Sequence, residues 1–323
     1  MSTVALSVVL AVTNEGAVRD GSLRGALGAL EQSVSAVSGG LSCEVVVVLP
    51  AGATVPPPDT GLRVHTLYVH AELAALTPVM WGTGLRAATG RVVAFTTAQL
   101  RVAPAWATAL MEALNPSVDA GVVGAGGPIA LRDAAGSSIP DAEDDAAILA
   151  RFHAYLPGRW PRVAPAADIP GDNAAYLRAR LLEYEDLLRD GFWEVEFHRR
   201  FARTGKQLLM VPAAFATVQG PMPGRAGFRA LTEQRYAHGV AFGIARVARH
   251  GHSMLRIVLA APVVPFVLLV RIARSARAAG VDAARVRRAL PAMLRLTAAW
   301  ARGEAVGARR AARPGNQVTF AHD

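Results

Sequence analysis

The stretch RVVAFTTAQLRVAPAWATAL, residues 91–110, decides the fold. It begins with a short apolar run, Val92–Phe95, passes through a polar segment that contains Thr97 and Gln99, and ends in a helical pattern opened by Pro104. An uninterrupted apolar run of this length indicates a strand that is buried on both faces, and proline suits the first turn of a helix. We therefore predict a buried strand, a polar turn and a helix, in that order.

Similar apolar runs alternate with helical patterns through the first half of the chain. We predict strands at Leu6–Val12, Cys43–Leu49, Leu62–Val69, Val92–Thr96 and Ala120–Val123, and helices at Ser22–Val37, Glu72–Ala88 and Ala105–Leu114. Continuous apolar strands separated by helices are typical of a parallel sheet covered on both faces. The predicted fold class is therefore α/β, with a doubly wound, mostly parallel sheet.

Polar residues follow two of these strands at the point where each strand ends. Thr13, Asn14 and Glu15 come after the first strand, and Thr97 and Gln99 come after the fourth. Sheets of this class bind ligands at the carboxyl ends of their strands, so we expect a ligand near these residues. The turn after the first strand has no G-x-G-x-x-G sequence, which argues against a nicotinamide or flavin site.

Charge is unevenly distributed along the chain. Residues 1–224 contain 17 Lys and Arg against 21 Asp and Glu, a net charge of −4, whereas residues 225–323 contain 17 Arg against 4 acids, a net charge of +13. The C-terminal third therefore favours an anionic partner. Cys43 is the only cysteine, which excludes an internal disulfide and a cysteine-based zinc site and suits a protein that faces the cytosol.

An uncharged apolar run, Ile257–Val270, lies inside the basic C-terminal third. A membrane-spanning helix needs roughly 20 residues, so this run is too short to span, and arginines flank it on both sides. We predict that it lies on an anionic membrane surface at the cytoplasmic face, as a peripheral or monotopic anchor. The alternative is that these helices only pack on the preceding domain. Nucleic acid is not expected as a partner, because no aromatic residues are interleaved with the basic ones.

Two further segments precede that region. GDNAAYLRARLL, residues 171–182, indicates a turn whose Asp172 or Asn173 caps a following helix. GFWEVEFHRRFARTG, residues 191–205, indicates a helix that ends at its last glycine. We predict one domain over residues 1–222 and a helical, Arg-rich region over residues 223–323.

The order of these elements resembles that of family 2 glycosyltransferases, which have the GT-A fold. LSVVLAVTNEG (6–16) is similar to that family's opening strand and turn, and CEVVVVLPAG (43–52) to its second strand. GDNAAYLRARLL resembles the acceptor-side Gly-x-Asn-Ala segment, and GFWEVEFHRRFARTG resembles the helix that carries an acidic Glu-Asp pair. The last two segments, taken together, carry the strongest resemblance, which implies a GT-A-like fold for the first domain.

This resemblance implies that a sugar moves from a nucleotide-sugar donor to a hydroxyl of a glycan or lipid-linked acceptor, with inversion, in the synthesis of cell-envelope polysaccharide or glycolipid. Inversion needs a general base, and a carboxylate suits that role because it is ionised at neutral pH. Glu194 aligns with the family's base. The implied donor-binding residues are Thr13, Asn14, Glu15, Thr97, Gln99, Arg235 and His238, and the implied acceptor-binding residues are Asp172, Asn173, Trp193 and His198.

The sequence departs from the family at the metal site. The family's Asp-x-Asp aligns with Thr97-Ala98-Gln99, and its uridine-binding acids align with Leu49 and Pro50. Neutral oxygens hold Mg²⁺ or Mn²⁺ more weakly than carboxylates do, so we expect no metal cofactor and expect basic side chains to neutralise the leaving phosphate. Two alternatives stay open: a non-catalytic GT-A-like binding or scaffold protein of an envelope-glycan assembly, and a nucleotidyl transferase on a similar sheet.

Overall fold

The computed structural model describes residues 4–13, 21–37, 40–53, 65–71, 76–115, 117, 119–130, 142–219 and 227–312. The chain divides into two compact units. Unit 1 consists of Met1–Arg132 and Tyr155–Gly220, and unit 2 consists of Asp133–Ala154 and Pro221–Asp323. This division differs from the predicted domains, 1–222 and 223–323, in two ways: the boundary falls after Gly220, and residues 133–154 group with the C-terminal part of the chain.

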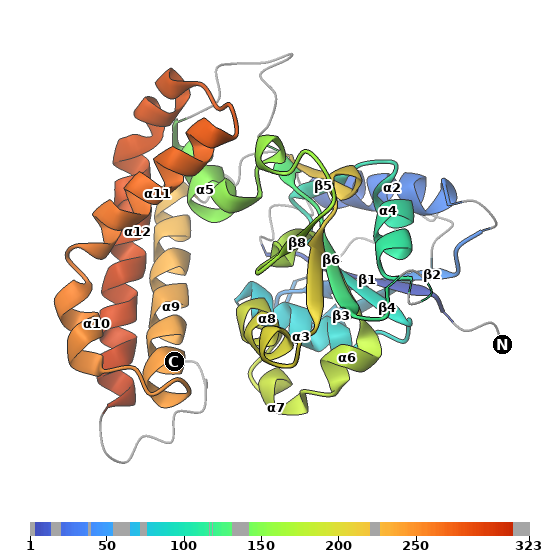
Figure 1. Cartoon of the computed structure of the whole chain (residues 1–323), viewed down its shortest axis with the longest axis horizontal. Coiled ribbons are helices and arrows are strands. Elements are labelled where there is room, and N and C mark those ends of the chain that lie inside the picture. Colours follow the sequence, from blue (N-terminus) through green and yellow to red (C-terminus); the bar gives the residue numbers. More distant parts are fainter. Residues whose placement is uncertain are drawn as a thin grey trace. The chain divides into compact units, whose positions relative to one another are not determined.

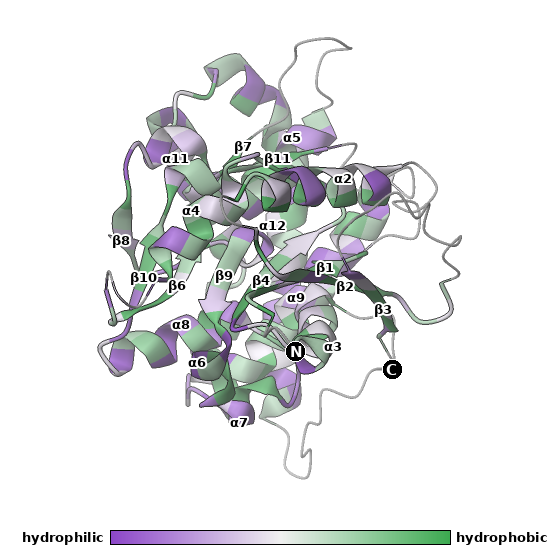
Figure 2. Ribbon diagram, turned by 90° about the vertical axis from the view of Figure 1, so that its right-hand side faces the viewer, coloured by the Kyte–Doolittle hydropathy of each residue, from purple (hydrophilic) through white to green (hydrophobic). Residues whose placement is uncertain are grey.

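Unit 1 (Figure 1) is built on an eight-stranded sheet. The strand order is β3-β2-β1-β4-β9-β6-β10-β8, which can be followed in Figure 2. The strands are β1 (Leu6–Ala11), β2 (Cys43–Leu49), β3 (His65–His70), β4 (Val92–Thr97), β6 (Val122–Gly126), β8 (Ala164–Ala166), β9 (Ala174–Leu177) and β10 (Gln207–Met210). Neighbouring strands are parallel except that β9 is antiparallel to β4 and β6, and β8 is antiparallel to β10. The predicted α/β class and mostly parallel sheet are confirmed.

Helices cover both faces of this sheet (Figure 2). They are α2 (Ser22–Ser35), α3 (Thr77–Ala87), α4 (Trp106–Ala113), α6 (Arg178–Leu182), α7 (Glu185–Leu188) and α8 (Glu194–Arg203), with short 3₁₀ turns η2 (Pro157–Arg159), η3 (Gly171–Asn173) and η4 (Pro212–Ala214). A small second sheet joins β5 (Leu100–Val102), β11 (Ala216–Val218) and β7 (Ile129–Ala130). The central strand β1 is buried at every residue, as its continuous apolar sequence predicts.

Strand β9 corrects one sequence prediction. The residues after Asn173 were expected to form a helix capped by Asp172 or Asn173, but Ala174–Leu177 form a strand and the helix begins only at Arg178. The strand lies between β4 and β6, with Tyr176 opposite Gly124 of β6. A Cβ atom on Gly124 would lie 2.7 Å from the Tyr176 ring, so the glycine makes room for the aromatic side chain. Tertiary pairing therefore overrides the weak local preference of this short segment.

Unit 2 is helical, which confirms the predicted C-terminal helical extension. Its helices are α5 (Ala142–Phe152), followed by the 3₁₀ turn η1 (His153–Tyr155) at the boundary, α9 (Gly227–Ala248), α10 (Met254–Ala260), α11 (Val264–Ala278) and α12 (Ala283–Ala311). An ion pair joins helices α5 and α12. The Arg285 guanidinium of α12 donates to both carboxylate oxygens of the buried Asp145 of α5 at 2.8 Å. This pair explains why residues 142–152, although distant in sequence, belong with the C-terminal helices.

A buried carboxylate ties the opening strands of unit 1 together. Glu44 of β2 accepts hydrogen bonds from the Ser7 hydroxyl of β1 at 2.5 Å and from the Thr89 amide at 2.7 Å. Burial acts to raise the pKa of Glu44, but the hydrogen bonds from Ser7 and Thr89 outweigh it, so the pKa is lowered. A lowered pKa stabilises the fold above the unfolded-state pKa, and that stability is lost as the pH falls.

We therefore expect Glu44→Gln to lower the free energy of unfolding by about 2 kcal/mol at neutral pH, because charge-assisted hydrogen bonds are weakened. Urea denaturation at neutral and acidic pH measures this, and the difference between variant and parent should shrink as the pH falls below the unfolded-state pKa. Glu112→Gln, at an exposed position on α4, serves as the control and should leave the pH dependence unchanged. Parallel pH profiles for Glu44→Gln and the parent would contradict this account.

Candidate active site

The carboxyl ends of β1 and β4 bring predicted donor-binding residues together. Ala11 and Thr97 are paired in register at the ends of the two strands, and the Ala98 amide donates to the Ala11 carbonyl at 3.0 Å. Beyond that point the Gln99 side-chain amide donates to the Thr13 hydroxyl at 3.1 Å. Thr97 and Gln99 are both buried, so the described side chains directly after β1 and β4 are neutral. Predicted residues Asn14 and Glu15 lie outside the described residues.

The Glu194 side chain lies at the same edge of the sheet. Turn η3 leads into β9, whose first residue, Ala174, is paired with Phe95 near the end of β4. A Cβ atom built on Gly171 of this turn would lie 2.9 Å from the Glu194 carboxyl carbon and 3.1 Å from its Oε1. The carboxylate of Glu194 therefore lies directly on the backbone of Gly171, next to the buried Asp172.

Trp81 of α3 also contacts this site, next to Gly171 and the end of β4. The hypothetical Cβ of Gly171 would also lie 2.9 Å from the Trp81 ring, and the Trp81 indole donates to the Thr96 carbonyl at 3.2 Å. The indole thus joins the end of β4 to the turn that faces Glu194. No side chain larger than hydrogen fits at Gly171 without displacing either Trp81 or the Glu194 carboxylate.

The start of α8 is fixed by close contact with α3. Gly191 has a φ of +106° and lies so close to α3 that a Cβ on it would be 2.7 Å from the Pro78 carbonyl, so glycine is required on both counts. The Phe192 amide donates to that same carbonyl at 2.7 Å. The Phe192 ring stacks on Phe95 of β4 with centroids 4.3 Å apart. These contacts hold the first turn of α8, and with it Glu194, against the end of β4.

His198 lies one helical turn after Glu194, between Asp168 and Tyr176. Its Nδ1 is 3.1 Å from the Asp168 carboxylate and its Nε2 is 2.8 Å from the Tyr176 hydroxyl. Burial lowers the pKa of His198 although Asp168 acts to raise it, so the ring is neutral at pH 7. A neutral ring has one N–H, and this network assigns it to Nδ1, with the Tyr176 hydroxyl donating to Nε2. Burial, and next the charge of Glu194, raise the pKa of Tyr176 well above its usual value.

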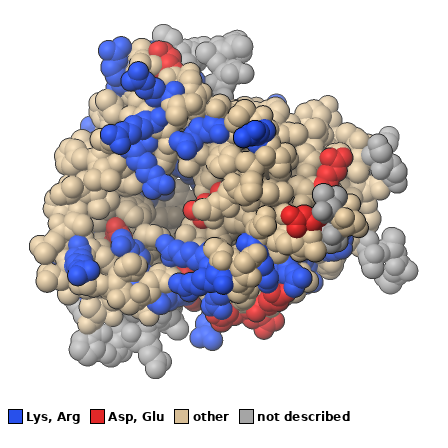
Figure 3. All heavy atoms as spheres, viewed as in Figure 1, with Lys and Arg blue, Asp and Glu red and all other residues tan. Residues whose placement is uncertain are grey.

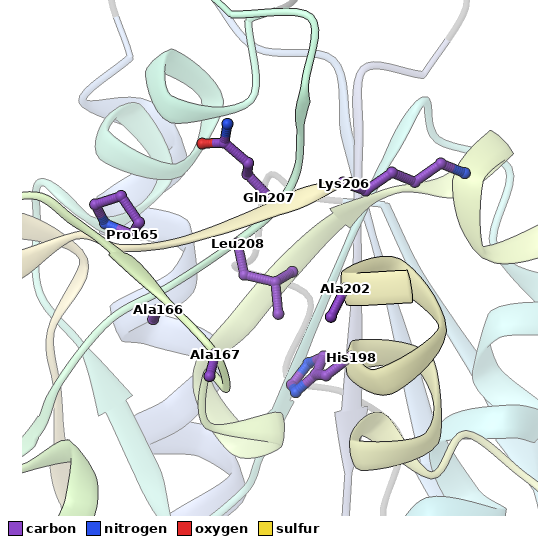
Figure 4. Close-up of a pocket in the computed structure, with 8 residues that line it drawn as sticks. All are labelled: Pro165, Ala166, Ala167, His198, Ala202, Lys206, Gln207 and Leu208. Carbon is purple, nitrogen blue, oxygen red and sulfur yellow. The ribbon is translucent and has the colours of Figure 1, made fainter. Parts of the chain in front are cut away.

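A pocket of about 250 Å³ opens beside His198 (Figure 4). The strand segment around Ala166 and Ala167 lies on one side of it and α8 on the other, with Leu208 between them. It is lined by Pro165, Ala166, Ala167, His198, Ala202, Lys206, Gln207 and Leu208. The lining is mostly apolar, and its polar side chains are His198, Lys206 and Gln207. Both ring nitrogens of His198 already have partners.

The other predicted acceptor-binding residues have distinct environments. Asn173 is fully buried, and its side-chain amide bonds to the Trp106 indole at 2.6 Å and to the Pro128 and Ala214 carbonyls at 3.1 and 2.9 Å. These contacts use its hydrogen-bonding groups to hold the turn, so it can serve a site by positioning rather than by direct contact. Trp193 is half-buried, and its indole donates to the Asp190 carbonyl at 3.0 Å.

The predicted phosphate-binding residues, Arg235 and His238, lie on α9 in unit 2. Burial and the neighbouring charge of Arg151 lower the pKa of Arg235 to about 10, so it stays charged at pH 7. Burial, with Arg235 and Arg151 nearby, lowers the pKa of His238 to about 3, so its ring is neutral. His238 can therefore offer an anion only a hydrogen bond.

The described residues contain no group of three or more His, Cys, Asp or Glu side chains placed to hold a metal ion. At the sheet edge, the position expected for a metal carries Thr97 and Gln99, whose neutral oxygens do not suit Mg²⁺ or Mn²⁺. The sequence predicts Glu194 and His198 as site residues, which stays a prediction, and it singles out the segment that begins at Gly171. It gives no signal for Trp81, Asp168 or Tyr176, which the structure places beside them. The spacing of Glu194 and His198, four residues apart, was the available signal that the two share a helix face.

Comparisons with known proteins give weak similarity. No family model matches the chain, and no curated protein matches it either. Among solved structures, it is similar to the mannosyltransferase PcManGT from Pyrobaculum calidifontis in complex with GDP-Man and Mn²⁺, with 16% identity and a TM-score of 0.43 over 98% of this chain and 77% of that one. It is also similar to GalNAc-T7 with UDP, GalNAc and Mn²⁺, with 15% identity and a TM-score of 0.45 over 73% and 47% of the two chains. Similarity of this extent does not establish a family.

Proposed function

We propose that the chain is an inverting glycosyltransferase that moves a sugar from a nucleotide-sugar donor to an acceptor hydroxyl. The observation that supports this most is the carboxylate of Glu194 lying against Gly171 at the carboxyl edge of the parallel sheet. Ligands of α/β sheets bind at this edge, and a carboxylate that is ionised at neutral pH can accept a proton there.

In the proposed reaction, the Glu194 carboxylate takes the proton of the acceptor hydroxyl while the hydroxyl oxygen attacks the anomeric carbon of the donor sugar. The new C–O bond forms on the face opposite the nucleotide, and the bond from the anomeric carbon to the phosphate oxygen breaks. The nucleoside diphosphate leaves with the bonding electrons, so the configuration is inverted. Glu194 is only half-buried, and water can then remove the proton.

The donor is proposed to be held without a metal ion. Thr13, Thr97 and Gln99 supply neutral hydrogen-bonding groups at the sheet edge, and Asn14 and Glu15 follow directly in sequence. Arg235 and His238, on α9 of unit 2, stay predictions from the sequence as phosphate-binding residues, the first through charge and the second through a hydrogen bond. Charge-assisted bonds of this kind can stabilise a leaving phosphate in place of a cation.

The acceptor is proposed to be a glycan or lipid-linked sugar, used in cell-envelope polysaccharide or glycolipid synthesis. Asp172 and Trp193 are assigned to its side of the site, with His198 and Asn173, whose hydrogen-bonding groups are already engaged, in positioning roles. Transfer is placed at the cytoplasmic face of a membrane. The apolar run within the basic C-terminal third supports this location, because a lipid-linked acceptor is reached only at a bilayer.

Donor binding tests this function against a non-catalytic scaffold. We expect calorimetric titration with a panel of nucleotide sugars to give saturable binding to at least one donor. The Kd should differ by less than about threefold between excess EDTA and added Mn²⁺, because neutral Thr97 and Gln99 occupy the position expected for the metal-binding acids. Gln99→Ala should weaken that binding about fivefold, the value of a typical hydrogen bond. Gln32→Ala, at an exposed position on α2, is the control and should leave it unchanged.

Two outcomes of this titration would contradict the proposal. Binding that appears only with Mn²⁺ would refute metal-independent donor recognition. No binding of any donor, by a chain that unfolds cooperatively, would favour the scaffold alternative, which the neutral Thr97 and Gln99 also allow.

A further inference from the structure

Helices α10 and α11 form a bent pair in unit 2, with 68° between them. In the described part of the chain, no single helix is both long and apolar enough to cross a membrane, whereas this pair reaches that length and composition when its two helices are combined. Pro262 lies in the bend. The backbone there remains paired, since the Ala261 and Val263 amides donate to preceding carbonyls at 3.1 and 2.9 Å.

The outer face of this pair exposes large apolar side chains to solvent. Their exposed fractions run from 49% to 68%, and they are Leu255, Leu259, Val263, Phe266, Val267 and Val270. Within α10, Leu255 and Leu259 are four residues apart, and within α11, Val270 follows Phe266 by four residues and Val267 by three, so each set lies along one face of its helix. Single exposed apolar residues need no explanation, but a run of neighbouring ones marks a docking surface.

The opposite face of the pair is already packed within unit 2. Ile257 of α10 and Ile272 and Ala276 of α11 are buried, and both helices contact α12. Burial of these residues accounts for the attachment of α10 and α11 to the unit. The exposed apolar residues therefore add nothing to that packing, although each costs hydrophobic free energy in water.

The charge around this apolar surface indicates what kind of partner covers it. Residues 234–281 contain seven arginines and no Asp or Glu, and basic side chains outnumber acidic ones over the C-terminal helices (Figure 3). On α11 the apolar stripe continues into exposed arginines, with Arg271 four residues after Val267 and Arg274 four after Val270. A second copy of this face would bring like charges together, whereas an anionic bilayer offers acyl chains to the apolar residues and phosphates to the arginines.

We propose that the anchor surface, defined as Leu255, Leu259, Val263, Phe266, Val267 and Val270 with Arg271 and Arg274, docks unit 2 on an anionic lipid bilayer. The bend between α10 and α11 enters the acyl region, and the arginines stay at the level of the lipid phosphates. The inference rests on the proposed transfer at a membrane and names the surface and the class of lipid that hold the enzyme there.

Vesicle flotation of the full chain tests the anchor surface without any donor present. We expect binding to phosphatidylcholine vesicles that contain phosphatidylglycerol and much weaker binding to phosphatidylcholine alone. Phe266→Asp should weaken binding to the anionic vesicles more than about tenfold, because the aromatic ring that enters the acyl region is replaced by a charge. Arg271→Gln and Arg274→Gln should each weaken it about fivefold and reduce its salt dependence. Phe215→Asp is the matched control, since Phe215 is 41% exposed but belongs to unit 1.

Equal binding of Phe266→Asp and the parent, or equal binding to neutral and anionic vesicles, would overturn the proposal. So would a lipid-free dimer that Phe266→Asp dissociates, because it would identify a second copy as the occupant. Donor titration separates this test from that of the proposed function: Phe266→Asp should bind donor as the parent does. If the chain floats with vesicles but binds no donor, the proposed anchor surface stands and the proposed transferase function fails.

Discussion

Glu194→Gln is expected to lower kcat for sugar transfer by about a thousandfold, with a donor Kd close to that of the parent. Glutamine keeps the volume of the side chain over Gly171, but it cannot accept a proton at neutral pH. The cost to folding should be small, about 0.5 kcal/mol, which is what a carboxylate in the first turn of a helix contributes. Single-turnover transfer, donor titration and thermal unfolding of the same preparation measure the three quantities.

Glu196→Gln provides the matched control on the same helix. Glu196 is two residues further along α8 and pairs with Arg199 at 3.3 Å, so it is engaged away from Gly171. We expect this variant to retain transfer activity within about threefold of the parent, because only a part-buried ion pair that points away from Gly171 is lost. Full activity in Glu194→Gln would remove Glu194 from the role of base, and equal losses in both variants would point to a structural effect on α8.

The parallel part of the sheet could be predicted because each strand is a continuous apolar run. Cys43–Leu49 forms a strand with the predicted bounds, and Val92–Thr97 exceeds its prediction by one residue. Strand β9 could not be predicted in this way, because a four-residue Ala-Ala-Tyr-Leu segment has little preference of its own. It forms a strand because its backbone pairs with both β4 and β6, and this pairing depends on the rest of the fold.

The same limit applies to the candidate site. Residues on one helix, such as Glu194 and His198, can be placed on one face from their spacing. Trp81 reaches the site from α3 and Asp168 from the segment before η3, and their approach depends on how α3, α8 and β9 pack together. Gly171 and Gly191 open two segments that the sequence singles out, but their close contacts could not be predicted, since each glycine leaves space for neighbours that only the fold supplies.

Gly243→Leu is expected to have the largest effect on stability, lowering the free energy of unfolding of unit 2 by about 3 kcal/mol or more through overpacking. Helices α9 and α12 approach each other through two G-x-x-x-G sequences, one in each helix. A Cβ on Gly243 would lie 2.1 Å from the Glu304 carbonyl, and a Cβ on Gly307 would lie 2.0 Å from the Val240 carbonyl. No rotamer change relieves these contacts because the obstructing atoms are backbone, so the helices must move apart. Urea denaturation followed by circular dichroism measures the loss.

Gly28→Ala separates this contact from the general effect of glycine in a helix. Gly28 lies in α2 with nothing within 4 Å of a Cβ, so alanine there should stabilise the chain by about 0.4–1 kcal/mol. At Gly243 the substitution should destabilise the chain instead. Moving the helices apart also breaks the ion pair between Arg246 and the buried Glu304, which are 2.5 Å apart. A stabilising Gly243→Leu would show that α9 and α12 do not approach as closely as these glycines require. If Gly243→Leu destabilises the chain while Gly28→Ala stabilises it, helix propensity cannot explain the difference, because both substitutions replace a helical glycine with a better helix former. The loss at Gly243 would then come from the close contact between the backbones of α9 and α12.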